Sequence, residues 1–285
     1  MGGKYRKRRN PWRRAGMTLG AVALGTLLFF MFRTMSAGTR SHDTHATEAD
    51  GSATWKDSLE YVIMPPSLSD NELQYSCFKI GFNPDKHIPN YAAWTLTADH
   101  TDGPYDRKNR KFLADANVYG SAYPEDYRKS GYDRGHMVPA ADMKWTDRGM
   151  DECHYLTNIC PQDNALNGGA WASLEKMSRK WAVKMGRIVI VCGPVLTDRI
   201  TRTIGRHEVA VPDRFFKVIL APDNDPPMGI GFIMPNKAVQ GGVQQSAMSI
   251  DQVEAITGFD FFPALPDDIE SAVEAQNAFN QWNRY

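Results

Sequence analysis

Four residues of different chemistry follow one another in the stretch "YDRGHMVPAADMKW", which covers residues 132–145. Asp133 and Arg134 point to opposite sides of an extended chain, so each needs a partner other than its neighbour. Gly135 has no side chain, which allows a sharp turn or the close approach of another group. The stretch is therefore predicted to present the imidazole of His136. Taken alone, the tetrapeptide could equally be a surface turn.

A second polar cluster lies downstream, in "YLTNICPQDNALNGGAWASLEKMSRKW" from residue 155. Asn167 stands where a helix N-cap would, so its amide oxygen could simply accept from the first-turn amides. Glu175 lies eight residues further on, roughly 80° around a helix from Asn167. Both side chains can therefore face one cleft.

A cleft that holds these side chains together with His136 suits phosphodiester hydrolysis. Imidazole can take a proton from water near neutral pH. Oxygen ligands suit Mg²⁺, or Mn²⁺ in its place. Guanidinium groups match the charge that develops on a phosphate.

Upstream, the run "YDRKNRKFL" supplies Arg107, Lys108, Arg110 and Lys111 within five positions. A solvated charged loop is the ordinary interpretation of such a run. Only proximity to His136 would give it a role at the site.

The strands that must position these residues follow from apolar alternation. "LQYSCFKIGFN" and "YAAWTLTADH", joined by the turn-rich "PDKHIPN", predict a hairpin. Four more apolar runs, "RIVIVCGP", "HEVAV", "RFFKVILAP" and "GIGFIMP", predict that antiparallel sheet dominates the second half.

Helices are predicted apart from these strands. Residues 168–185 carry apolar side chains at helical spacing and end at Gly186. "SIDQVEAITG" begins with a capping-box pattern, and "PDDIESAVEAQNAFNQW" places Pro266 and two acids at a helix start. Strands in runs with helices set apart from them indicate an α+β fold.

Three motifs, in the same order, resemble the DNA/RNA non-specific endonuclease family, which includes secreted bacterial nucleases and mitochondrial endonuclease G. They are "DRGH" at 133–136, "NICPQ" at 158–162 and "NGGAWASLE" at 167–175. The resemblance covers roughly Tyr75 to Asp268. It implies a ββα-metal fold, in which a central antiparallel sheet has the catalytic histidine on one side and the metal ligand on a crossing helix.

The resemblance also implies roles for single residues. His136 would be the general base that activates water, and Asn167 the single direct protein ligand of Mg²⁺. Glu175 would hold metal-bound water, and Arg110 would stabilise the phosphate. The remaining residues expected to line the site are Asp133, Arg134, Asn158 and Gln162.

The reaction that the resemblance implies is hydrolysis of DNA and RNA to 5′-phosphate ends. Two alternatives remain open at this point. One is an enzyme that uses the same metal and histidine on another phosphodiester or phosphate substrate. The other is a catalytically silent, membrane-anchored binding domain, against which the intact His136, Asn167 and Glu175 argue.

Charge divides the chain into two parts. Residues 1–50 hold nine Lys and Arg against three Asp and Glu, which leaves 24 against 30, or 24 − 30 = −6, for residues 51–285. Such a balance argues against a broad basic surface that wraps nucleic acid. A local basic cleft or a bound metal can still hold phosphate.

The first part has the pattern of an export or anchor signal. Seven Lys or Arg lie in residues 1–14, and residues 15–32 are uncharged, near the lower limit for a membrane span. The pattern predicts a cytoplasmic basic segment, a transmembrane signal anchor over 15–32, a flexible linker over 33–55 and a nuclease domain over 56–285. The domain would then lie outside the cytoplasm, periplasmic or extracellular. Cleavage after Ala37 or Gly38 would instead give a secreted form.

The cysteines indicate neither zinc nor thioredoxin-like chemistry. There are four of them, and no two form a Cys-x-x-Cys pair. Cys192 lies in an apolar run, where a small buried side chain is expected. Outside the cytoplasm four cysteines would allow three complete disulfide pairings, among which the sequence does not choose.

Overall fold

The computed structural model describes residues 55–197 and 199–285. The predicted basic segment, membrane anchor and nearly all of the predicted linker lie outside these residues. Within the described ranges, no helix is long and apolar enough to cross a membrane.

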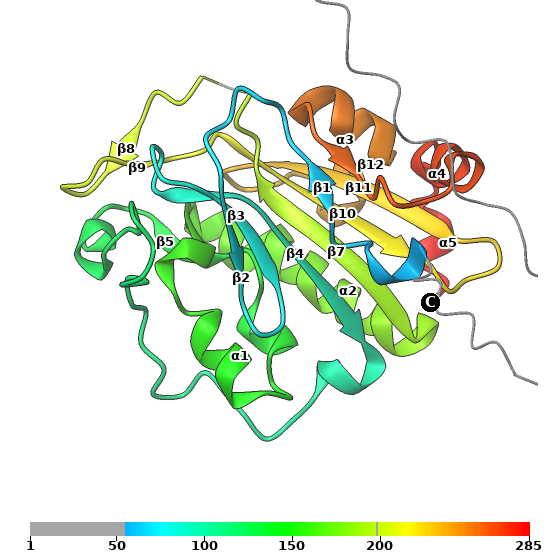
Figure 1. Ribbon diagram of the computed structural model, residues 1–285, viewed down its shortest axis with the longest axis horizontal. Helices are drawn as coiled ribbons and strands as arrows, with labels where there is room; N and C mark the ends of the chain where they lie inside the picture. The colour runs from blue at the N-terminus through cyan, green and yellow to red at the C-terminus, as the bar shows by residue number, and fades with distance from the viewer. Residues whose placement is uncertain (1–54, 198) are drawn as a thin grey trace, which may run out of the picture. The chain divides into compact units, whose positions relative to one another are not determined.

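Seven strands form the central sheet, in the order β12-β11-β10-β7-β4-β3-β2, and every neighbouring pair is antiparallel (Figure 1). The strands are β2 (Asn71–Gln74), β3 (Lys79–Asn83), β4 (Ile88–Thr97), β7 (Arg187–Pro194), β10 (Arg214–Ala221), β11 (Met228–Pro235) and β12 (Ala247–Met248). The predicted hairpin is β3–β4, and three of the four later runs are β7, β10 and β11.

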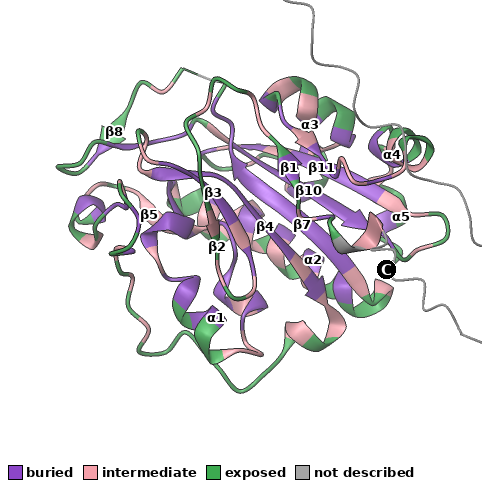
Figure 2. Cartoon of the chain, viewed as in Figure 1, coloured by how far each residue is buried: buried purple, intermediate pink, exposed green. Residues whose placement is uncertain are grey.

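Both faces of this sheet are covered, which explains why its central strands are apolar throughout (Figure 2). On one face Ile190 and its neighbours pack against α2 (Ala172–Met185). On the other face Val191 belongs to a second core with residues of α3 (Ile250–Thr257) and α4 (Asp267–Glu274). The prediction of an α+β fold with a central antiparallel sheet and flanking helices is confirmed.

A smaller ribbon carries the first motif. The strands β5 (Asp133–His136) and β6 (Ile159–Gln162) pair antiparallel, with Asp133 opposite Gln162 and His136 opposite Ile159. After β6 the chain enters a π-helical turn, Leu166–Trp171, that leads directly into α2. The segments β5, β6 and α2 thus form a β-β-α unit on one face of the sheet.

Local signals place the helix ends. The hydroxyl of Ser249 accepts from the backbone N–H of Gln252, whose side chain accepts in return from the N–H of Ser249. Gly258 has φ 74° and Gly186 has φ 84°, the left-handed side of the backbone map, where glycine is favoured at a helix end.

Two predicted elements differ from the structure. The run "PDDIESAVEAQNAFNQW" forms α4 and a separate short helix, α5 (Phe279–Trp282), because the side chain of Gln276 bonds to the backbone of Pro227 and Gly229 at the start of β11. The run "HEVAV" forms only a short strand outside the main sheet, because Glu208 has φ 55°. The smaller elements are β1 (Val62–Ile63), β8 (Thr203–Ile204), β9 (Val209–Ala210), β13 (Asp260–Phe261) and α1 (Asp147–Glu152). All four cysteines are free, and Cys192 is buried as expected.

Candidate active site

A pocket of about 640 Å³ opens beside β5 and the start of α2. Five of the eight predicted site residues line it: Asp133, Arg134, His136, Asn167 and Glu175. The β-β-α unit brings them together, because the first three lie on β5 and the other two lie on the π-helical turn and α2.

Gly135 lets β5 lie close to β6. A Cβ atom on this residue would lie 2.1 Å from Oε1 of Gln162, far inside van der Waals contact. Gln162 itself is fully buried behind the strand and does not line the pocket. The glycine before His136 is therefore explained by the approach of a neighbouring side chain, one of the two interpretations that the sequence allowed.

The imidazole of His136 is held among aromatic rings. Its ring centroid lies 5.2 Å from that of Phe112 and 5.0 Å from that of His154, which stands nearly perpendicular to it. Its Nε2 atom is buried and has no hydrogen-bond partner in the described part of the chain. Burial, helped by His154 and Arg107, lowers the pKa of His136 to about 3. The ring is therefore neutral at physiological pH.

Asn167 is oriented by Asp133. The carboxylate of Asp133 accepts hydrogen bonds from Nδ2 of Asn167 at 2.9 Å and from Nδ2 of Asn164 at 3.0 Å. With its NH₂ group turned toward Asp133, Asn167 keeps its Oδ1 atom as a free acceptor. Asn167 lies inside the π-helical turn, whose N-cap is Ala165, so it does not serve as the cap. A neutral amide oxygen near a carboxylate is a donor set that fits a hard divalent cation.

Glu175 supplies a second carboxylate to the pocket that Asn167 lines. It is half-buried, and burial raises its pKa to about 7, against the opposing effect of Lys217. Lys217 is itself buried, with its Nζ atom 4.4 Å from the ring of Trp171 and 5.5 Å from that of Trp94. The pKa of Glu175 thus depends on the positive charge of Lys217, a residue of the central sheet.

Comparison with known proteins agrees with this geometry. The sequence model of the DNA/RNA non-specific endonuclease family matches residues 56–268. The chain belongs to this family. The mitochondrial nuclease EXOG of Mus musculus is 32% identical over 268 residues, which cover 88% of this chain and 72% of the relative. The mitochondrial Nuclease 1 of Schizosaccharomyces pombe is 32% identical, with 73% of this chain and 70% of the relative covered.

The fold agrees as well. A solved structure described as the EndoG/EndoGI complex, on the mechanism of EndoG inhibition, is similar with a TM-score of 0.66 and 26% identity. The match covers 70% of this chain and 88% of that chain. The protein is therefore a nuclease, a hydrolase that acts on nucleic acids, and the expected family resemblance is confirmed.

The predicted location of the nuclease is wrong. A membrane-anchored domain outside the cytoplasm was expected, whereas the relatives described above are named as mitochondrial nucleases. The physical reason is that basic residues followed by apolar ones serve as addresses for more than one compartment, so charge and hydropathy alone do not identify the destination.

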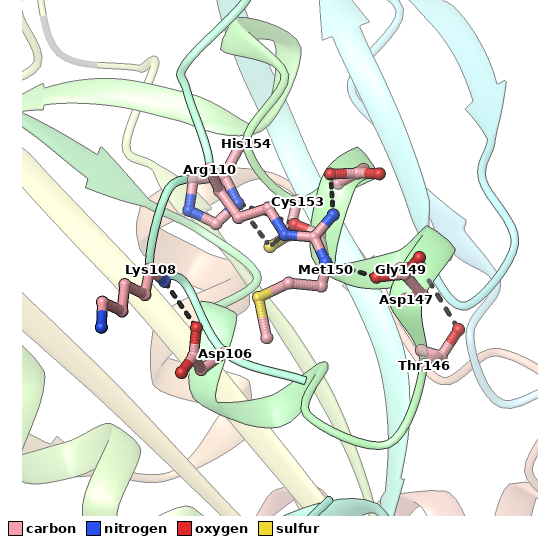
Figure 3. A network of polar contacts seen from close by, with 10 residues as sticks. Asp106, Lys108, Arg110, Thr146, Asp147, Gly149, Met150, Cys153 and His154 are labelled. Atoms are coloured by element: carbon pink, nitrogen blue, oxygen red, sulfur yellow. Dashed lines mark hydrogen bonds and ion pairs between the residues drawn. The ribbon is translucent and has the colours of Figure 1, made fainter. Parts of the chain in front are cut away.

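Arg110, predicted to stabilise the phosphate, does not line the pocket of the nuclease. It belongs to a network of polar contacts with α1 (Figure 3). Its guanidinium pairs instead with Asp147 and Asp151 on α1. Arg107, from the same basic run, is exposed and lines the pocket. The sequence could not separate the two arginines, because the acidic side of α1 that holds one of them lies some forty residues away.

Arg134 does reach the pocket of the nuclease. Its Nη2 atom donates to the carbonyl oxygen of Pro124 at 3.1 Å, and its guanidinium lies 5.2 Å from the ring centroid of Phe112. Packing against an aromatic ring and one carbonyl holds the planar group while leaving other donors for a ligand.

Asn158 is buried and binds the backbone of two neighbouring segments. It is fully buried, accepts from the N–H of Val138, and donates to the carbonyl oxygens of Val138 and Cys153. It therefore holds the chain that follows β5 against the end of α1 and does not contact the pocket. Asn158 and Gln162 support the site from behind.

Sequence reasoning missed three neighbours of the site: Phe112, His154 and Lys217. A lysine inside the apolar run "RFFKVILAP" was a usable signal for a buried charge. The two rings around His136 carried no comparable signal, because nothing in their local sequence sets them apart from ordinary core residues.

Proposed function

We propose that the pocket hydrolyses phosphodiester bonds of DNA and RNA with His136 as general base and with Mg²⁺ or Mn²⁺ held through Asn167. One observation carries the proposal. The neutral imidazole of His136 shares a pocket with Asn167, whose NH₂ group donates to Asp133 and whose amide oxygen therefore stays free. The relatives named as nucleases support the substrate class.

His136 would accept the proton of the attacking water. Because Nε2 is buried, Nδ1 is the nitrogen that would meet this water. The water oxygen forms a bond to phosphorus, and the bond from phosphorus to the 3′-oxygen breaks. The products are a 5′-phosphate and a 3′-hydroxyl, as the family resemblance implies, with the leaving oxygen protonated from solvent.

The other side chains would hold the phosphate and the cation. Oδ1 of Asn167 would be a direct ligand, and the carboxylate of Glu175 would contact the ion through its hydration shell. When bound, the cation would supply positive charge next to the scissile phosphate and its leaving oxygen. Arg107 and Arg134, in place of Arg110, would orient the phosphate through charged hydrogen bonds.

Both alternatives that the sequence left open lose support. A silent binding domain is disfavoured because the relatives are nucleases and the chain keeps the polar set of the pocket. Another phosphate substrate is disfavoured because the matching family model describes action on DNA and RNA.

Replacement of the base and of the ligand tests the proposal. We expect His136→Ala to lower kcat by roughly 10² to 10⁴, the contribution of a positioned general base. Asn167→Ala should lose comparable activity but recover part of it at raised Mg²⁺. Asn164→Ala is the matched control, since it removes the other amide on Asp133 and should keep most activity. A folded His136→Ala protein that nicks both DNA and RNA at a near-normal rate would refute the assignment.

A further inference from the structure

The outer face of α2 carries a run of basic residues. Residues 176–184, "KMSRKWAVK", contain four Lys or Arg and no Asp or Glu. The surrounding part of the chain, residues 51–285, is acidic overall, with 24 basic and 30 acidic residues, a balance of 24 − 30 = −6. The segment thus carries a local positive charge on a part of the chain that is acidic overall.

This face is continuous with the pocket described above. Leu174 and Trp181 are buried against the sheet, so the opposite side of the helix faces outward. At about 100° per residue, Ala172, Lys176 and Lys180 lie within roughly 80° of one another. Ala172 lines the pocket. The two lysines therefore extend this side of α2 along the helix as a basic stripe.

A second hollow, of about 570 Å³, lies along this stripe. The residues around it include Lys176, Arg179, Lys180, Val183, Lys184 and Tyr285. Val183 and Tyr285 are 54% and 48% exposed and place apolar surface beside these charged side chains. The hollow thus combines cations with apolar surface, the combination that binds a sugar-phosphate backbone and its bases.

Within the described residues, the lysines of this stripe have no ionic partner. Arg179 is paired with the buried Asp142 at 2.8 Å, but no ion pair joins Lys176, Lys180 or Lys184 to any residue of the described ranges. Like charges four residues apart destabilise a helix, whereas an acidic residue at one of these positions would stabilise it. Helix stability therefore does not explain the pattern.

We propose that Lys176, Lys180 and Lys184, the basic stripe of α2, bind the phosphodiester backbone of the substrate to one side of the scissile phosphate. The inference rests on the pocket being the active site. Eight residues of helix span about 12 Å, over which one strand of a duplex presents roughly three to four phosphates. The stripe gives an acidic domain a local polyanion-binding surface and favours long substrates over short ones.

Charge reversal at the far end of the stripe tests the proposal. The test variant is Lys180→Glu/Lys184→Glu in the full chain, since neither residue lines the catalytic pocket. The matched control is Lys79→Glu/Lys86→Glu, with the same change in net charge on β3 and the turn after it, outside both hollows. Melting temperatures of all proteins establish that they are folded.

Binding is measured in a His136→Ala background, with a labelled 20-base-pair DNA duplex at several salt concentrations. Each lost phosphate contact lowers the slope of log Kd against log salt by about 0.9 on duplex DNA. We expect the slope to fall by about 2 in the test variant and to stay unchanged in the control. At low salt Kd should rise at least about tenfold.

Turnover separates this proposal from the assignment of the pocket. With His136 intact, the test variant should lose kcat/KM on long DNA but cleave a dinucleotide at the same rate as the unaltered protein. A salt slope equal to that of the control would overturn the proposal, as would equal losses on long and short substrates. Failure of the catalytic assignment would appear separately, as dinucleotide cleavage that survives His136→Ala.

Discussion

Gly135→Ala is predicted to damage both stability and activity, although it adds only one methyl group. The added Cβ would lie 2.1, 2.3 and 2.4 Å from Oε1, Cδ and Cγ of Gln162, whereas ordinary contacts begin near 3.4 Å. Gln162 is fully buried, so its side chain has no solvent-facing position to adopt. Overpacking of this kind costs about 1 to 3 kcal/mol. In a domain of this size each kcal/mol lowers Tm by about 2 to 4 °C.

The same change should displace His136, the next residue along β5. A shift of about 1 Å at a catalytic group can cost roughly 100-fold in rate, so kcat should fall by about 10- to 100-fold. The matched control is Gly168→Ala, where an added Cβ meets nothing within 4 Å and Tm should stay constant.

A double-mutant cycle identifies the cause of the damage. Gln162→Ala removes all three clashing atoms, and its amide has no hydrogen-bond partner to lose within the described residues. The combined variant Gly135→Ala/Gln162→Ala should therefore be more stable than the sum of the single changes by about 1 to 3 kcal/mol. Urea unfolding measures this coupling. Additive effects, or a Gly135→Ala protein as stable as the unaltered one, would refute the reasoning.

Three further predictions concern charge and metal. Arg107→Ala should lower kcat/KM on DNA by roughly 100-fold, by loss of a charged donor to the phosphate, while Arg110→Ala should change activity only a few-fold; nicking assays of the two proteins compare them directly. Burial and the neighbouring Glu254 raise the pKa of Glu274 to about 8, so the folded protein binds this proton more tightly than the unfolded chain does. The stabilisation that protonated Glu274 gives to the folded protein is therefore lost as pH rises from about 4.5 to 8. Tm should thus fall between pH 5 and 9, and Glu274→Gln should reduce that fall; equal curves for both proteins would contradict this. EDTA should abolish activity and leave Tm nearly unchanged, because an ion held by one neutral ligand contributes little to folding, whereas a large loss of Tm would indicate a structural ion.

Those parts of the fold that depend on local pattern could be predicted. Buried strands are apolar whatever they pair with, so "RIVIVCGP" and "RFFKVILAP" were identifiable before their neighbours were known. The capping box at Ser249 and the glycine at 258 are signals confined to one helix. Five of the eight predicted site residues line the pocket, because the motifs that contain them fold as one β-β-α unit.

What could not be predicted depends on contacts between distant segments. Arg107 and Arg110 are alike in sequence, and only the acidic residues of α1 decide which one is held away from the pocket. Asn158 and Gln162 belong to a site motif but point into the protein interior, a matter of side-chain direction that spacing does not reveal. The break between α4 and α5 follows from hydrogen bonds between the side chain of Gln276 and the start of β11. Sequence rules for helix ends do not include such long-range contacts.

The stretch "DRGH" joins four separate requirements in four consecutive residues. Asp133 orients the amide of Asn167, and Arg134 is packed over an aromatic ring with donors to spare. Gly135 admits the buried side chain of Gln162, and this contact fixes how closely β5 lies to β6. His136 then sits at the end of the strand with one nitrogen buried. Because consecutive strand residues face opposite sides, Gly135 meets Gln162 while His136 enters the pocket, so the packing of β5 on β6 also sets the position of the imidazole.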